Sequence, residues 1–230
     1  MQSTDDRLVF VDVEAVGSVR KPHVIQIAAI ATNGKMEELA GFEAKAQLPK
    51  GGKPKPSHSR YNKKLWDAEG SDAKKVAIEF ASFLTRNATV ERYSKNGQMF
   101  RVAQMVAHNS GFDSDILQAW FKQLNVYLPA SFQTLCTMQR AMWLSQEASD
   151  NFRPSDFRLV SLCKHFGIEH SPKQAHDAFN DVRATLLLYR EMRMCQHASR
   201  VTSVGGTASS VGCGARKPSN LVSDAVQQND

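Results

Sequence analysis

The stretch Leu8-Val9-Phe10-Val11-Asp12-Val13-Glu14 sets two acidic residues at the end of an apolar run. Residues 8–13 predict a short buried strand, because branched and aromatic side chains suit a pleated, buried surface. Residues two apart on a strand point to the same face, so the carboxylates of Asp12 and Glu14 are expected side by side. Adjacent carboxylates repel each other unless a cation lies between them. The pair therefore predicts either a metal site or a strand that ends in water.

The segments that follow predict how the chain leaves this strand. Residues 24–31 form a second apolar run, and Asn33-Gly34 comes directly after it and Thr32. Both residues of this dipeptide tolerate a positive φ, which makes it a strong signal for a tight hairpin turn. Residues 36–48 would then return as a third strand. We therefore expect the chain to begin with an antiparallel meander and not with a βαβ unit.

The remaining sequence predicts helices with short strands between them. Short apolar runs at residues 105–107 and 132–135 favour strands, and the polar residues 91–101 favour an insertion or an exposed hairpin. Helical spacing of apolar residues favours helices over 73–85, 111–124, 138–144, 158–165 and 175–194. The predicted fold class is α/β, with a mixed sheet that has an antiparallel start and is flanked by helices.

The composition predicts one folded domain and a tail. Of the 230 residues, 42% are hydrophobic, which is enough for a core. Residues 196–230 are rich in Ser and Gly and lack periodicity, so we expect a domain over residues 1–195 followed by a disordered tail. No run approaches the roughly 18 apolar residues that a membrane span needs, and the polar residues 1–6 do not resemble a secretory signal.

Charge and cysteine usage restrict the class of protein further. The net charge of +6 permits attraction to a polyanion but does not demonstrate it. The cysteines are scattered without a Cys-x-x-Cys pair, which favours free thiols in a reduced, cytoplasmic setting and argues against a zinc site. These cysteines are Cys136, Cys163, Cys195 and Cys213.

Two later segments add acids to the pair on the first strand. Asp113 ends the segment His108-Asn109-Ser110-Gly111-Phe112-Asp113, and Asp181 ends His176-Asp177-Ala178-Phe179-Asn180-Asp181, which opens an apolar helical run. Taken alone, Asp113 could simply cap a helix, and His176 could be an ordinary surface or structural histidine. Taken together, four carboxylates and one imidazole suit metal-assisted cleavage of a phosphodiester.

The order and spacing of these motifs resemble the DEDDh 3′–5′ exonucleases, the family of the DNA polymerase III proofreading subunit, ribonuclease T and oligoribonuclease. Asp-x-Glu follows the first strand, His-Asn-x-x-Phe-Asp follows a later one, and His-x-x-x-x-Asp opens the last helix. Softer similarities are Thr134-Leu135-Cys136-Thr137 and the spacing of apolar residues over 159–168. The resemblance covers residues 7–194 and implies a ribonuclease-H-like exonuclease fold.

The resemblance also implies a mechanism. Two Mg²⁺ or Mn²⁺ ions would be held by Asp12, Glu14, Asp113 and Asp181, because carboxylate oxygens suit these hard cations. His176 would accept the proton of the attacking water. The expected reaction releases nucleoside 5′-monophosphates from nucleic-acid 3′ ends, on single-stranded DNA or unpaired ends. A polymerase or another replication or repair protein would be a partner if the enzyme proofreads.

Three alternatives remain open at this point. The substrate could be RNA, which would make the chain an exoribonuclease. The fold could serve as a non-catalytic nucleic-acid-binding module, although all five catalytic positions are filled. A ribonuclease-H-type endonuclease would use the same cluster and would ignore a blocked 3′ end.

Other residues are candidates for substrate contacts. Relatives commonly follow the first acid pair with Thr-Thr-Gly or Thr-Gly, whereas this chain has Ala15-Val16-Gly17 and lacks the hydroxyl that would face the terminal nucleotide. The loop over residues 50–64 is rich in lysine, and Tyr61 and Trp66 are interleaved with its basic residues, so it predicts either a phosphate-tracking rim or a solvated loop. Phe112 could wedge against a base or lie in the core. His108 and Asn109 are expected to position the strand end more than to bind metal. The candidate substrate-binding residues are Ala15, Val16, His108, Asn109, Phe112, Lys53, Lys55, Lys63 and Lys64.

Overall fold

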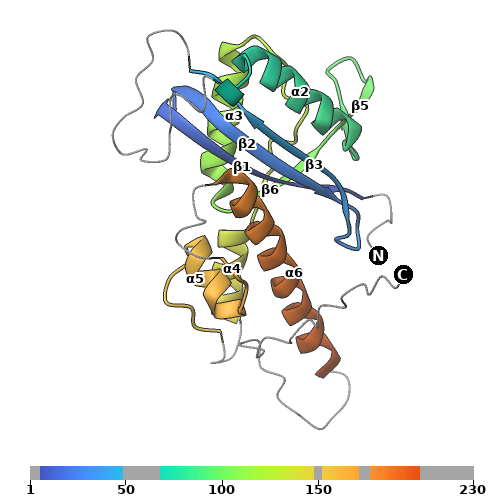
Figure 1. Cartoon of the computed structure of the whole chain (residues 1–230). Helices are drawn as coiled ribbons and strands as arrows, with labels where there is room; N and C mark the ends of the chain where they lie inside the picture. The colour runs from blue at the N-terminus through green and yellow to red at the C-terminus, as the bar shows by residue number, and fades with distance from the viewer. Residues whose placement is uncertain (1–5, 49–67, 148–151, 171–176, 203–230) are drawn as a thin grey trace, which may run out of the picture.

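The computed structural model describes residues 6–48, 68–147, 152–170 and 177–202, and of residues 196–202 only the backbone (Figure 1). Its centre is a five-stranded sheet in the order β3-β2-β1-β6-β7. The strands are β1 (Leu8–Ser18), β2 (Lys21–Thr32), β3 (Glu38–Lys45), β6 (Gln104–Ala107) and β7 (Leu135–Cys136). The first three pair antiparallel, whereas β1, β6 and β7 pair parallel. The predicted antiparallel start and mixed sheet are therefore confirmed.

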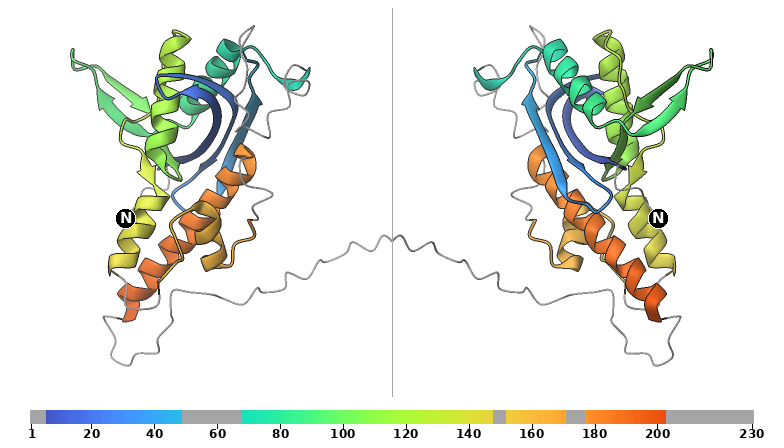
Figure 2. Two further views of the ribbon diagram at one scale, coloured as in Figure 1. Left: turned by 90° about the vertical axis from the view of Figure 1, so that its left-hand side faces the viewer. Right: turned by 90° about the vertical axis from the view of Figure 1, so that its right-hand side faces the viewer.

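Helices cover both faces of this sheet (Figures 1 and 2). They are α2 (Ala73–Arg86), α3 (Ser110–Gln123), α4 (Thr137–Glu147), α5 (Leu159–Phe166) and α6 (Ala178–Thr202). The β1 residues Val9, Val11 and Val13 share a core with α2 and α3, whereas Leu8 and Phe10 pack with apolar residues of α6. Because side chains alternate along a strand, Asp12 and Glu14 belong to the face that α6 covers.

A third core lies beyond the sheet, where α4 and α5 pack on α6 (Figure 1). It is built from Ala141, Leu144, Phe152, Leu162, Leu188 and Met192. One helix thus joins the sheet to this helical part of the domain. The sequence predicted the three helices, but α6 runs to Thr202, past the expected end at residue 194. The tail predicted over residues 196–230 thus overlaps α6 at residues 196–202, where the chain is helical, and the rest of that tail lies outside the described residues.

The turn between β2 and β3 differs from the predicted two-residue turn at Asn33-Gly34. Residues 33–37 separate the strands, and the positive φ of 69° falls on Met36. The side-chain oxygen of Asn33 accepts the backbone N–H groups of Lys35 and Glu37 at 2.9 and 3.0 Å, which closes a longer loop. Arg193 of α6 also donates to the Gly34 carbonyl at 2.9 Å, so the helix holds this loop in place.

The first strand is longer than predicted and turns tightly into β2 after Ser18. Gly17 has a φ of 101°, and a Cβ atom there would lie 2.5 Å from the Lys21 carbonyl oxygen. This close approach requires glycine. The pairing of β1 with β2 shifts register between Glu14 and Ala15. Such a bulge redirects the strand locally, and bulges are common beside active sites.

Residues 91–101 form part of a separate hairpin, built from β4 (Val90–Tyr93) and β5 (Met99–Val102). The prediction of an exposed hairpin is confirmed, since Tyr93 and Met99 at its end are largely exposed. The last predicted strand is shorter than expected, since residues 132–134 precede β7.

The cysteines differ in their bonding state. Cys136 and Cys163 are free thiols, whereas Cys195 is in a disulfide, so the prediction of free thiols is wrong for Cys195. A disulfide requires proximity in space and not Cys-x-x-Cys spacing, which is why the sequence pattern did not reveal it.

Within the described residues, none of the helices combines the length and the apolar character needed to cross a bilayer.

Candidate active site

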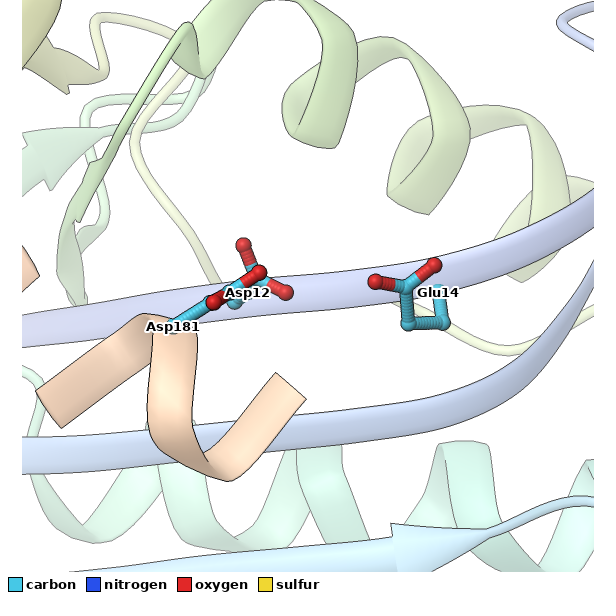
Figure 3. Close-up of side chains that lie close together, drawn as sticks. All are labelled: Asp12, Glu14 and Asp181. Carbon is cyan, nitrogen blue, oxygen red and sulfur yellow. The ribbon is translucent and has the colours of Figure 1, made fainter. Parts of the chain in front are cut away.

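Three predicted carboxylates meet between β1 and the start of α6. Asp12, Glu14 and Asp181 each offer a carboxylate oxygen, and these atoms all lie within 4.8 Å of one another. In Figure 3 the carboxylates of Asp12 and Asp181 lie next to each other, with Glu14 farther along the β1 ribbon. The alternation of β1 turns the two strand acids toward α6, and Asp181 lies in the first turn of that helix. Oxygens at this spacing suit a Mg²⁺ or Mn²⁺ ion.

Asp113 contacts the same strand from the first turn of α3. It lies in the first turn of α3 and is 6% exposed, and its Oδ1 accepts the backbone N–H of Val13 at 3.2 Å. This bond fixes the backbone between Asp12 and Glu14. Asp113 is not one of the three residues whose oxygens lie within 4.8 Å, so the structure brings together three of the four predicted metal ligands and places the fourth beside them.

The cluster is electrostatically unfavourable without a cation. Burial raises the pKa of Asp12 well above its usual value, and the charges of Asp113, Asp181, Glu14 and Asp177 raise it further. Burial also raises the pKa of Asp113 to about 8, although the Val13 N–H favours the charged form. A bound divalent ion would relieve this repulsion. The donor set consists of hard oxygens, so the residues present fit the predicted metal.

The first turn of α6 is fixed by contacts that the sequence motif did not predict. Asp177 precedes the helix, and its Oδ1 accepts the backbone N–H of Asn180 at 3.1 Å, which caps the helix. Its Oδ2 accepts the side-chain amide of Gln26 at 3.3 Å, and that amide also donates to Glu43 at 3.3 Å. Gln26 is 4% exposed and pairs with Glu14 across β1 and β2. These bonds hold the helix that carries Asp181 against the sheet.

A second unpredicted contact reaches Asp181 from the loop after α5. The Nε2 atom of His170 lies 3.1 Å from Asp181 Oδ1, and the two side chains are 3% and 11% exposed. His170 lies outside the third motif, which begins at His176. No spacing rule in the sequence identifies it. His176 lies outside the described residues, so its predicted role remains a prediction.

His108 and Asn109 shape the end of β6. His108 Nε2 lies 3.0 Å from the Phe157 carbonyl, which can only accept, so this nitrogen carries the proton. The other ring nitrogen lies 2.9 Å from the Thr137 hydroxyl and accepts from it. Asn109 is the N-cap that precedes α3, and its φ is 64°, a conformation that asparagine tolerates well. Both ring nitrogens of His108 thus have protein partners, which supports its predicted positioning role.

The stability of the protein is expected to fall in acid through His108. Burial lowers its pKa to about 4, although the bond to the Phe157 carbonyl favours the charged form. The unfolded chain, with a pKa near 6.5, therefore binds more protons between about pH 4 and 6.5. His108→Gln, which does not titrate, should remove up to about 3 kcal/mol of the pH-dependent loss over this range. Urea unfolding of both proteins in EDTA at several pH values measures it, and parallel stability curves would contradict it.

The remaining candidate substrate residues differ in exposure. Phe112 is 47% exposed beside Asp113, so the alternative of a core position is wrong. Val16 is 5% exposed and packs with Ile25 and Leu48, which leaves its side chain little surface for a nucleotide and does not support its predicted contact. Ala15 is partly buried against the core that lines α2 and α3. Lys53, Lys55, Lys63 and Lys64 lie outside the described residues.

Comparison with known proteins agrees with this arrangement. A family model described as exonuclease, RNase T, matches residues 9–189. Among curated proteins, a putative bifunctional exonuclease/endonuclease protein of Mycobacterium tuberculosis is 33% identical over 82 residues, which is 36% of this chain and 12% of that protein.

Solved structures of exonuclease I share the fold. E. coli exonuclease I in complex with a dT13 oligonucleotide gives a TM-score of 0.66 at 24% identity, covering 85% of this chain and 43% of that one. The zinc-bound form of an E. coli exonuclease I complex with single-stranded DNA gives 0.65 at 21% identity, covering 86% and 42%. The chain thus spans less than half of these structures. The predicted ribonuclease-H-like fold is confirmed.

Proposed function

The chain belongs to the RNase T family of exonucleases, of the DEDDh type, and we propose that it hydrolyses nucleic-acid phosphodiesters from a free 3′ end. The products would be nucleoside 5′-monophosphates, and the substrate would be single-stranded DNA or an unpaired 3′ end. Two Mg²⁺ or Mn²⁺ ions would be the cofactors. The chain covers less than half of the exonuclease I structures, so this activity is proposed for the domain itself.

The observation that carries this proposal is the meeting of Asp12, Glu14 and Asp181 within 4.8 Å. Burial and like charges raise the pKa of Asp12, so the cluster is costly in the absence of a cation. A domain that only bound nucleic acid would gain nothing from buried negative charge near its ligand's phosphates. The cluster therefore favours catalysis over the non-catalytic alternative.

Each residue would contribute a distinct step. Asp12, Glu14 and Asp181 would hold the ions, and Asp113 would keep the strand backbone in place through Val13 while supplying the fourth carboxylate. Bound divalent ions supply positive charge at the phosphate and lower the pKa of a water molecule. His176 would accept the proton of that water. Phe112, exposed beside Asp113, would contact the terminal base.

A single assay tests the proposal. Single-stranded DNA, single-stranded RNA and duplexes of matched sequence, each labelled at the 5′ end, are incubated with the protein in Mg²⁺ or EDTA. We expect a Mg²⁺-dependent ladder that shortens from the 3′ end, with mononucleotides as products. Cleavage of a substrate with a blocked 3′ end would indicate an endonuclease, and retention without cleavage would indicate a binding module. The relative rates on DNA and RNA decide the substrate class.

The lysine-rich loop provides a separate prediction about binding. Replacing Lys53, Lys55, Lys63 and Lys64 with Gln should weaken substrate binding more than it slows cleavage of bound substrate. The dependence of log affinity on log salt should flatten by up to about 0.7 for each lost phosphate contact. Titrations of labelled single strands in EDTA over a range of salt concentrations measure the slope.

A variant with the same loss of charge elsewhere controls for the change in net charge. Lys74, Lys75, Lys95 and Lys122 are all exposed on α2, the β4–β5 turn and α3. Their replacement with Gln should leave the salt slope close to that of the unmodified protein. If both variants change the slope equally, the loop is an ordinary solvated segment.

A further inference from the structure

His170 is a buried polar side chain that lies against a candidate metal ligand. It follows α5, and its Nε2 lies 3.1 Å from Asp181 Oδ1. The His170 side chain is only 3% exposed, so solvent cannot readily satisfy its ring nitrogen. Nε2 makes no hydrogen bond of standard geometry with any residue in the described ranges, so its contact with Asp181 is a close approach of the two groups at 3.1 Å.

The chemistry of the two groups determines the direction of such a bond. A charged carboxylate only accepts, so His170 must present an N–H at Nε2. A donor held at one oxygen restricts rotation of the carboxylate and so fixes the direction in which it faces a cation. Residues outside the ligand shell that fix ligand orientation in this way commonly set metal affinity.

His165 on α5 is a nearby histidine in the sequence that lacks this contact. Its ring meets Phe152 and Phe166 edge-on, with ring centroids 4.9 and 5.3 Å away. Its Nε2 is also buried without a hydrogen bond among the described residues, and no ion pair links it to a described acid. His165 therefore fills space among aromatic rings, whereas His170 lies against Asp181 of the carboxylate cluster.

We infer that His170 is a positioning residue that orients the Asp181 carboxylate for the metal ions, by donating from Nε2 to Oδ1. This inference rests on the proposed function, because it assigns Asp181 to a metal site. Together with Gln26 and Asp177, it means that the start of α6 is aligned on both sides: by β2 through the cap and by the loop after α5 through Asp181 itself.

The test compares two side chains of similar length that differ in hydrogen bonding. His170→Gln retains an N–H donor near the position of Nε2, whereas His170→Met does not. Binding of Mn²⁺ is measured without substrate, from the electron paramagnetic resonance signal of the free ion. We expect His170→Met to raise the Mn²⁺ dissociation constant by about 10-fold or more and His170→Gln to restore most of the affinity. His165→Met, the matched control, should stay within about 2-fold.

Activity assays add a second readout. The Mn²⁺ concentration for half-maximal hydrolysis should rise in His170→Met, and saturating Mn²⁺ should recover part of the rate. Circular dichroism and the melting temperature verify folding of every variant. If His170→Met does not fold, His170→Asn, which is too short to reach Asp181, takes its place.

The possible results separate this inference from the proposed function. If His170→Met binds Mn²⁺ as tightly as the wild-type protein does, the positioning role is overturned. The same holds for His170→Asn where that variant is used instead. Equal losses in the Met and Gln variants overturn it as well, because they indicate a packing role. A wild-type protein that binds Mn²⁺ but cleaves no nucleic acid contradicts the proposed function, while the binding data still decide the role of His170. A wild-type protein that binds no Mn²⁺ overturns both.

Discussion

Asp12→Asn is expected to abolish hydrolysis while making the metal-free protein more stable. The substitution removes a ligand from the cluster, and the loss of several kcal/mol of transition-state stabilisation corresponds to at least about 10³-fold in rate. It also removes a buried negative charge that has Asp113, Asp181 and Glu14 close by. Relief of about 1 kcal/mol of repulsion would raise the melting temperature by roughly 2–4 °C in a protein of this size.

Opposite effects on rate and stability are what distinguish a metal ligand from a structural acid. The melting temperature is measured in EDTA and the rate in Mg²⁺, on the same preparation. Asp181→Ala should lose activity to the same extent. Asp115→Asn, which removes an exposed charge from α3 near Asp113, should change neither quantity much. Near-normal Mg²⁺-dependent activity in Asp12→Asn would show that the metal assignment is wrong.

The stability of the metal-free protein should also depend on pH in a defined direction. Asp113 has a pKa of about 8 in the folded protein against about 3.8 for the unfolded chain. Its contribution to stability is therefore complete below about pH 4 and is lost as the pH rises through 8. Asp113→Asn in EDTA should flatten this decline, and saturating Mg²⁺ should offset it in the unmodified protein.

His176→Ala is expected to lower turnover by roughly 10²–10⁴-fold, the usual contribution of a positioned general base. Mn²⁺ binding should survive, because the carboxylates remain. The wild-type rate should rise with pH on the acid side, as the imidazole loses its proton and becomes able to accept another. The variant should lose this acid-side rise in its pH–rate profile, and higher pH should partly restore its rate.

Mutations can distinguish a general-base role of His176 from a role in capping the last helix. If His176 only capped the last helix, its removal would cost about 1 kcal/mol of stability and little activity. The cap, however, is Asp177, whose Oδ1 accepts the Asn180 N–H. Asp177→Ala should therefore show the loss of stability while retaining the acid-side rise in its pH–rate profile. A His176→Ala variant with turnover within a small factor of wild type would eliminate the general-base assignment.

Local patterns predicted those parts of the fold and site that depend on local geometry. The alternation along β1 placed Asp12 and Glu14 on one face, and apolar spacing located α2 and α3 closely. The hairpin signal at Asn33-Gly34 located the turn but not its form, because Arg193 and the Asn33 side chain stabilise a longer loop. Tertiary contacts thus determined what the dipeptide alone could not.

The contacts around the site could not be predicted because they join residues far apart in the sequence. Asp113 bonds to the backbone of Val13, and Gln26 bonds to Asp177. A backbone N–H leaves no mark on the sequence, and a buried glutamine resembles any polar residue in a strand. His170 carries no periodic signal either, since it lies in a loop. The candidate ligands were therefore identifiable from their motifs, whereas the residues that contact them were not.

The position of α6 has a consequence for the newly synthesised chain. The β1–β2–β3 meander pairs neighbours in sequence and can form early, whereas Asp181 reaches Asp12 only when a helix from the far end of the chain docks on the sheet. A ribosome-bound or truncated fragment that lacks α6 would present Asp12 and Glu14 without their third carboxylate. The proposed hydrolysis would thus require α6 to be docked, and a fragment that ends before this helix should not show it.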